Sequence, residues 1–469
     1  MNHSIVIKIM RNEWRAMWHA RIPAILLGLL MLLLVVASFA SQHDWQHHAQ
    51  TVAKANQQSN QDWQSQPNRH PHRVSHYGDF VVKPIHLLSV IEPGIIDQSG
   101  HLVYLEGHRL NSTNFNPATE FTSLGRFPTI TPAAVIQWFM PLLLIMAGYA
   151  CITRERAEGT LQYLIGNGTH PARIVMGKWL ALYLPVMTVL LAFSALFSFF
   201  VWQQPEGLLR LGIMVIGQCV YLASWCLIVV AVSWNSRHLH SALLALLLLW
   251  VCVCVIFPKG LANLAQITYP THPRTEAEYH AEQKLKTVGD SHNQNDPHFA
   301  EFKANILKRY GVHSTDELPV NYNGLLMQEG ERLTTAVYRE QQALHQTQLL
   351  NQNAWIRKWL WLSPALALQY VQTAASGSDI AHHHAFIEQS EQRRFGLISY
   401  LNQLHAEQVD HHDDKNQRLE ADFWKRAPRP TIQLAPLHVS ATALIAAIAV
   451  LLFWLLVPLM LLLRTLKHQ

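Results

Sequence analysis

The sequence predicts an all-α membrane protein with six transmembrane helices, a mixed α/β region after the first helix and a mainly helical region before the sixth. Half of the 469 residues are hydrophobic and only 14% are charged, whereas soluble domains have about 25% charged residues. Six runs are apolar and contain no Asp, Glu, Lys or Arg, and a membrane-spanning helix needs about 17–25 such residues. The runs are 22–40, 133–152, 179–202, 211–234, 241–257 and 439–463.

The segment before the first run, 1–21, is expected to form a cytoplasmic amphipathic helix. The sequence Ser38-Phe39-Ala40 resembles the cleavage site of a signal peptide. However, the apolar run is longer than the ~7–15 residues typical of a signal peptide, and a long charged segment precedes it. We therefore expect an uncleaved first transmembrane helix.

The distribution of Lys and Arg predicts the orientation of the chain. Four segments with a combined charge of +8 lie on one side of the predicted helices: 1–21, 153–178, 235–240 and 464–469. Three segments with a combined charge of −3 lie on the other: 41–132, 203–210 and 258–438. The positive-inside rule places both termini in the cytoplasm and two large regions in the periplasm of a bacterial inner membrane. Topology thus explains the basic excess, and nucleic acid is not an expected partner.

The two periplasmic regions have different predicted structures. Region 41–132 continues the first helix to about Gln66 and then contains short strands at 80–82 and 102–105. Region 258–438 is mostly helical, with expected helices at 274–288, 297–309, 325–352, 355–374 and 379–408, and breaks at Gly289, Gly311, 319–324 and Gly377. All five cysteines lie in apolar runs, so both regions must be held by packing. The tryptophans Trp355, Trp359 and Trp361 fit either the membrane interface or a domain core.

Segment 153–178 contains a motif suited to force transfer. Gly159 permits a tight entry into a short helix, which Thr160 can cap. Leu161 and Leu164 form an apolar face at i, i+3 that suits the groove of a partner. The other motif residues are Glu155, Arg156 and Glu158, which can orient docking, and Pro171, Gly177 and Lys178.

This segment, with an acidic residue before Gly-Thr-Leu, a short helix and then Gly-Lys, resembles the loop between the second and third helices of type-2 ABC transporter permeases. The resemblance implies that it couples the chain to an ATPase. Nearly the whole chain is similar to a bacterial subfamily with large periplasmic loops after the first and before the sixth helix. The matching periplasmic residues include His72, His76, Tyr77, Gly78, Pro93, Gly94, Glu106, His108, Arg126, Pro319, Asn321, Gly324 and Asp379. His70 and Gly107 depart from the subfamily pattern, which usually has asparagine and alanine there.

The source of energy is expected outside this chain, which has no G-x-x-x-x-G-K-[ST] phosphate-binding loop. The resemblance implies a non-catalytic permease served by two copies of a P-loop ATPase, which bind ATP and Mg²⁺, and a second permease, identical or paralogous. Membrane lipid and a periplasmic protein are further expected partners. The predicted spans lack the ionisable residues that ion-coupled transporters keep at membrane depth. A lipid-like or amphipathic substrate, or mechanical movement of the periplasmic regions, is therefore expected.

Two alternatives remain at this point. A membrane-anchored periplasmic metalloenzyme would use His72 and His76, which have the i, i+4 spacing of metal ligands on a helix, with Glu106 and His108. Arg73 stands where a zincin motif has glutamate, and a structural role for these imidazoles is favoured. A scaffold would bind the ATPase without transport of its own.

Overall fold

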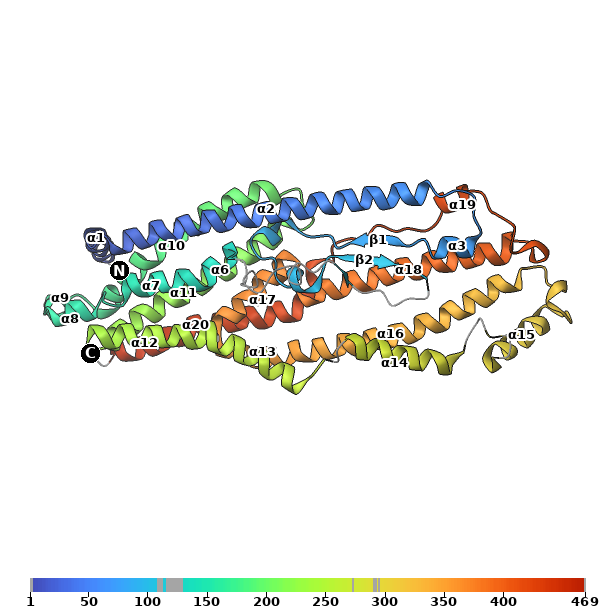
Figure 1. Cartoon of the computed structure of the whole chain (residues 1–469). Helices are drawn as coiled ribbons and strands as arrows, with labels where there is room; N and C mark the ends of the chain where they lie inside the picture. The colour runs from blue at the N-terminus through green and yellow to red at the C-terminus, as the bar shows by residue number, and fades with distance from the viewer. Residues whose placement is uncertain are drawn as a thin grey trace.

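The computed structural model describes residues 3–107, 113–114, 130–271, 274–289, 293 and 296–467. The molecule is an elongated assembly of helices (Figure 1). Both ends of the chain lie at one end of it, together with α1 (His3–His19), α8 (Thr153–Ala157) and α9 (Thr160–Gly166). We call this end, formed by α1, α8 and α9, the terminal face.

Six helices are long and apolar enough to cross a membrane, and they correspond to the six predicted runs. The chain is thus a multi-pass, mainly helical membrane protein. The spans are Pro23–Gln64, Pro132–Ala157, Pro171–Val201, Gly207–Asn235, Leu239–Thr268 and Leu437–Lys467. The fifth is longer than the predicted 241–257, because the helix continues past its apolar run to Thr268.

The spans contain both α-helical and π-helical segments. The α-helices are α2 (Ile22–Gln64), α6 (Pro132–Ala134), α7 (Met140–Gly148), α10 (Pro171–Val201), α11 (Gly207–Asn235), α12 (Leu239–Val251), α13 (Phe257–Thr268) and α20 (Ala441–Lys467). The π-helical turns are η3 (Val135–Phe139) and η4 (Cys252–Ile256). A π-turn shifts the hydrogen-bond register by one residue, and each turn ends two residues before a proline, Pro141 or Pro258.

Prolines within the spans leave backbone carbonyls without their helical donor, and side chains from other helices replace that donor. In a lipid environment an unpaired carbonyl is costly, so these bonds also fix how the helices pack. The three examples are Pro141 with Tyr221 Oη donating to Gln137 O (2.6 Å), Pro185 with Trp14 Nε1 donating to Ala181 O (2.8 Å), and Pro258 with Ser363 Oγ donating to Val253 O (2.5 Å).

Helix α11 is the most deeply buried of the six spans. It packs against α7, α10, α20 and α17 (Pro364–Ser376). Tyr221 and Trp225 of α11 are fully buried within the main apolar cluster. With 29 residues, α11 is about 43 Å long. It runs from the terminal face to the other half of the molecule, which we call the polar half (the described residues within 41–131 and 269–436).

The polar half is built on long helices and one small sheet (Figure 1). Its longer helices are α14 (Arg274–Val288), α15 (Pro297–Tyr310), α16 (Tyr322–Lys358) and α18 (Ile380–Gln408), and its short ones are α3 (Pro71–Ser75), α4 (Ile96–Ser99) and α19 (Asp422–Lys425). The antiparallel sheet has the order β1 (Asp79–Val82), β2 (Leu102–Leu105), β3 (Thr113–Asn114). The strands predicted at 80–82 and 102–105 are confirmed, and they pair with each other.

Two predicted features of this half are wrong. The helix expected at 355–374 is interrupted, because α16 continues to Lys358 and α17 begins anew at Pro364 with Ser363 as its cap. Gly324 is not a break but lies inside α16. A Cβ there would be 2.2 Å from the backbone nitrogen of Ala406, so this glycine lets α16 pack closely against α18.

Of the three tryptophans that fitted either the membrane interface or a domain core, Trp361 is 48% exposed, which excludes it from a domain core.

Asp79 holds four parts of the polar half together. It is 1% exposed and accepts hydrogen bonds from Ser59 of α2 (2.8 Å), Arg393 of α18 (2.6 Å) and Arg429 (2.6 Å). Removing one partner of a buried ion pair leaves the other charge without compensation.

We expect Asp79→Asn to lower the free energy of unfolding by about 3 kcal/mol, the lower part of the range for such pairs, because the amide oxygen still accepts one bond. Denaturant unfolding of the purified protein in detergent measures this loss. The matched control is Asp44→Asn, an exposed carboxylate on α2, which should leave stability unchanged. Equal stability of both variants would contradict the role of Asp79.

Candidate coupling site

The Gly177-Lys178 pair lies near the start of α10, against α1. Lys178 Nζ is 2.5 Å from Glu13 Oε2 of α1 and 2.5 Å from Glu155 Oε1 of α8. The Lys178 and Glu13 side chains are buried, and that of Glu155 is 24% exposed. We call Glu13, Glu155 and Lys178 the Lys178 cluster. Buried charges need partners, so this cluster joins three helices at the terminal face.

Gly177 allows α1 to cross α10 at close range. A Cβ at this position would lie 2.7 Å from Ile9 Cγ2 and 3.2 Å from the carbonyl oxygen of Val6. A side chain here would therefore push α1 away from Lys178. The glycine and the lysine of the motif thus both contribute to the contact between α1 and α10. Glu13, which no sequence motif marks, completes that contact.

Helix α8 is fixed to the end of α11. Arg156 donates hydrogen bonds of 2.5 Å to the carbonyls of Trp234 and Ser236. Ser233 Oγ accepts a backbone N–H from the start of α8 at 3.3 Å. Glu155 and Arg156, which were expected to orient a partner, instead bind their own chain. Arg156 attaches α8 to the end of α11, and Glu155 attaches α8 to α10 through Lys178.

The turn between α8 and α9 is formed by Gly159. Its φ of +78° lies in the left-handed region, which glycine adopts without strain, and it is the N-cap of α9. The expected cap by Thr160 is wrong. The Thr160 hydroxyl donates to the carbonyl of Glu155 at 3.1 Å and thereby closes α9 back onto α8.

The apolar face of α9 contacts its own chain. Leu161 is 4% exposed and, with Leu164, packs in the main apolar cluster. The expectation that these leucines enter a partner's groove is therefore wrong. The accessible part of the segment is polar and aromatic: Tyr163 is 72% exposed and Glu158 is exposed. The sequence could have indicated that Tyr163 is exposed, because it lies between Leu161 and Leu164 but not on the helix face that the two leucines share.

Two other motif residues begin helices, and a third lies just before one of these helices. Pro171 occupies the first turn of α10, after His170, whose Nδ1 accepts a backbone N–H. Asn321 is the N-cap of α16, and its Oδ1 accepts the N–H of Asn323 at 2.9 Å. Pro319 is exposed just before it. These residues determine where helices start, which is a structural role.

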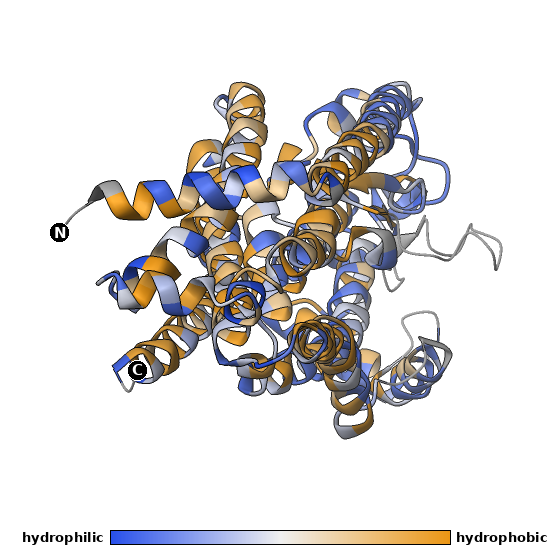
Figure 2. Cartoon of the chain, turned by 90° about the vertical axis from the view of Figure 1, so that its left-hand side faces the viewer, coloured by the Kyte–Doolittle hydropathy of each residue, from blue (hydrophilic) through white to orange (hydrophobic). Residues whose placement is uncertain are grey.

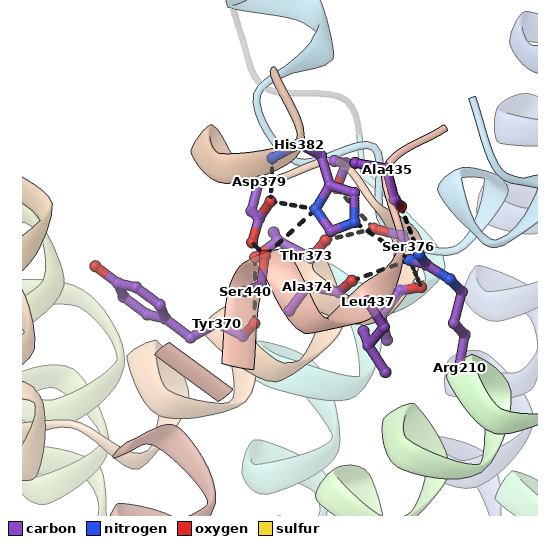
Figure 3. A network of polar contacts seen from close by, with 12 residues as sticks. Arg210, Tyr370, Thr373, Ala374, Ser376, Asp379, His382, Ala435, Leu437 and Ser440 are labelled. Carbon is purple, nitrogen blue, oxygen red and sulfur yellow. Dashed lines mark hydrogen bonds and ion pairs between the residues drawn. The ribbon is translucent and has the colours of Figure 1, made fainter. Parts of the chain in front are cut away.

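A second polar junction lies where α11 meets the polar half (Figure 3). Arg210, in the first turn of α11, is 1% exposed. Its Nη2 donates to the carbonyl of Ala435 at 2.9 Å and pairs with Glu206 Oε2 at 2.9 Å. Its Nη1 lies 3.5 Å from His382 Nε2 of α18. The guanidinium therefore connects α11 with the segment that leads into α20 and with α18.

The junction continues through Asp379, the N-cap of α18. Asp379 Oδ1 lies 2.6 Å from His382 Nδ1, and the Ser440 hydroxyl donates to Asp379 Oδ2. Burial raises the pKa of the Asp379 carboxyl, but the bonds from His382 and Ser440 outweigh it and lower the pKa below its usual value. We call Arg210, Asp379, His382 and Ser440 the Asp379 network.

The Asp379 network is not a nucleophilic triad, although it contains Ser, His and Asp. Asp379 and Ser440 both approach His382 at Nδ1, whereas Nε2 faces the Arg210 guanidinium (Figure 3). An activated serine needs a free ring nitrogen as its base. The geometry supports a structural connection between elements rather than catalysis.

The Pro93-Gly94 motif packs beside this network. Gly94 has φ +57°, and a Cβ there would lie 2.3 Å from Ser378 Oγ. Ser378 Oγ donates to the carbonyl of Glu92 at 3.1 Å. Two motifs far apart in the sequence therefore meet next to Asp379.

The predicted histidine cluster is only partly within the described residues. His76 Nδ1 lies 3.9 Å from Glu106 Oε1, and the His72 and His76 rings are 4.9 Å apart. His108 and Arg126 lie outside the described residues. Among the residues that the structure describes, His72 and His76 do not belong to a group of three close metal-ligating atoms.

Next to it, Tyr77 and Gly78 form the turn into β1. Tyr104 of β2 donates its hydroxyl proton to the carbonyl of Tyr77 at 3.1 Å. Gly78 has φ +79°, and the Tyr104 ring occupies the place of a Cβ. These motif residues therefore hold the small sheet in register.

A different group, His70, His405 and Asp414, brings its potential ligand atoms within 4.8 Å of one another. His70 Nδ1 accepts the N–H of His72, so in the neutral ring Nε2 carries the proton and is not free to bind a metal. Burial, followed by the proximity of His405, lowers the pKa of His70. Asp414 accepts bonds from His405 (2.6 Å) and Asn321 (2.7 Å). The arrangement is a hydrogen-bonded group that joins α3, α16 and α18.

Comparison with known proteins adds one match. Residues 275–431 match the model of a domain of unknown function (DUF3526). The match covers α14 to α19, which is most of the second part of the polar half. No curated protein matches the chain.

Proposed function

We propose that this chain is the membrane subunit of an ATP-driven transporter of the type-2 ABC permease class. In this proposal a separate P-loop ATPase binds the terminal face, and α11 passes its movement to the polar half. ATP and Mg²⁺ are bound by the ATPase. The chain either exports an amphipathic substrate or moves its polar half mechanically in the periplasm.

The main support for the proposal is that α8 and α9, which carry exposed side chains, are firmly attached to the spanning helices. The tip, Glu158 and Tyr163, projects from two short helices that are fixed to α11 by Arg156 and to α1 and α10 by Lys178. A force applied to such a tip moves the helices behind it rather than bending a loop. The sequence 153–178 supplies the resemblance, and this arrangement supplies a physical route for the movement.

The α11 helix provides the second half of that route. At the terminal face, Ser233 and Trp234 of α11 bind α8. At the polar half, Arg210 of α11 contacts the Asp379 network. A movement of α8 is therefore transmitted along one helix to the start of α18. This favours a transporter or mechanotransmitter over a passive scaffold.

We expect Glu158→Arg with Tyr163→Ala to remove ATPase binding without unfolding the chain, because both side chains are exposed. Each central aromatic contact of an interface can contribute 2 kcal/mol or more, so at least a thirtyfold loss of affinity is expected. Co-purification in mild detergent and the ATP hydrolysis rate of the complex measure it. The matched control is Glu301→Arg with Tyr279→Ala, both exposed in the polar half.

The outcomes separate the proposals. Loss of the ATPase in the tip variant alone supports the coupling role of the tip. Retained binding with normal hydrolysis in the tip variant would contradict it. Binding of the ATPase without any effect of transport conditions on hydrolysis would favour a scaffold.

A further inference from the structure

An apolar cavity of about 340 Å³ lies between α1 and the spanning helices at the terminal face. It is lined by Trp14, Met17 and Trp18 of α1 and by side chains of α2, α7 and α10. Its volume is in the range of small-molecule sites. The lining is almost entirely aliphatic and aromatic, and suits a hydrocarbon chain rather than a polar ligand.

The mouth of this cavity is next to a basic stripe on α1. Arg11 and Arg15 precede Trp14 and Trp18 by three residues each, so on the helix each arginine is adjacent to a cavity-lining tryptophan. Both arginines are exposed. Neither forms an ion pair with any residue that the structure describes. Arg21, exposed at the turn between α1 and α2, adds a third positive charge.

Helix α1 has the features of a helix that lies in the membrane interface. Figure 2 shows it across the end of the bundle, with polar and apolar residues along its length. Around the circumference of α1, the buried Val6 and Glu13 are followed by the exposed Trp14 and Trp18 and then by the arginines. This is the order expected for a helix that lies between a protein core, lipid and the headgroups. Tryptophan at the interface and arginine beside the headgroups are typical of such helices.

We propose that this cavity binds an anionic phospholipid, whose acyl chain enters between α1, α2, α7 and α10 while its phosphate is held by Arg11 and Arg15. Charge complementarity selects the occupant, because uncompensated arginines at the rim favour an anionic headgroup over a zwitterionic one. The site is formed by the same turn of α1 that carries Glu13. The bound lipid therefore stabilises the contact between α1 and Lys178. The proposal does not depend on the identity of the ATPase partner.

The test uses the full chain purified in detergent and two added lipids with identical short acyl chains, phosphatidylglycerol and phosphatidylcholine. Thermal unfolding at increasing lipid concentration gives the affinity of each. We expect phosphatidylglycerol to bind about thirtyfold more tightly, since each of the two arginines near an anionic headgroup contributes about 1 kcal/mol. Arg11→Gln with Arg15→Gln should abolish this preference. Lys308→Gln with Arg309→Gln, exposed basic residues of α15, should preserve it.

A second variant tests the cavity itself. Ala147→Phe fills the space with a ring and should weaken both lipids equally, while native mass spectrometry shows whether lipid still remains bound to the folded protein. Equal affinity of the wild type for both lipids would overturn the proposal. So would a preference for phosphatidylglycerol that survives the loss of Arg11 and Arg15, or unchanged lipid binding in the filled variant.

Discussion

Replacing Lys178 by methionine is expected to detach α1 from the bundle and, under the proposed function, to abolish coupling to the ATPase. The substitution leaves the carboxylates of Glu13 and Glu155 close together and partly buried, without a cation. Breaking a buried ion pair in this way costs about 3–5 kcal/mol, and we expect the upper end because two carboxylates then repel each other. Thermal unfolding in detergent and limited proteolysis between α1 and α2 measure the effect.

A compensated variant distinguishes charge from packing. In Glu13→Gln, Lys178→Met, Glu155→Gln the same positions carry no charge, and most of the lost stability should return. Coupling should remain impaired, because the ion pairs that hold α1, α8 and α10 together are gone. A Lys178→Met protein with wild-type stability and an intact α1 would contradict the role assigned to the Lys178 cluster.

Replacing Arg210 by methionine is expected to separate ATP hydrolysis from movement of the polar half. The guanidinium is 1% exposed and connects Glu206, Ala435 and His382. Without it, α11 loses its polar connection to α18, whereas the tip at the terminal face remains intact. Hydrogen exchange of α16 and α18 amides, with and without ATP in the assembled complex, reports this movement.

The expected result is an ATP-dependent change of exchange in the wild type that disappears in Arg210→Met, while hydrolysis continues. Arg210→Lys is the control for charge, and it should restore the change only in part, because lysine lacks the planar fork that reaches several acceptors at once. The same ATP-dependent change in Arg210→Met would show that α11 does not carry the movement through this contact.

The membrane-spanning helices could be predicted because each one depends only on the apolar composition of its own run. A run such as 211–234 is apolar throughout, and burial in lipid requires a helix whatever its neighbours are. The strands 80–82 and 102–105 were also local patterns. The break at Ser363 was missed because the apolar pattern continues across it, although Pro364 marks the start of a new helix.

The candidate site was only partly predictable, because its key contacts are distant in sequence. Gly177 and Lys178 stood out as a motif, but their partner Glu13 lies more than 160 residues earlier, and no spacing rule connects them. Leu161 and Leu164 were correctly seen as an apolar face. The sequence could not show that the face belongs to the chain's own core, which leaves Tyr163 and Glu158 exposed instead.

The most direct test of the account replaces Tyr163 with a photo-crosslinking phenylalanine analogue in the native host. Tyr279, equally aromatic and 57% exposed on α14, is the matched control position. If the terminal face is the coupling site, a P-loop ATPase crosslinks at position 163 and not at position 279. No ATPase at position 163, or the same crosslinked proteins at both positions, would contradict the assignment of the terminal face as the coupling site.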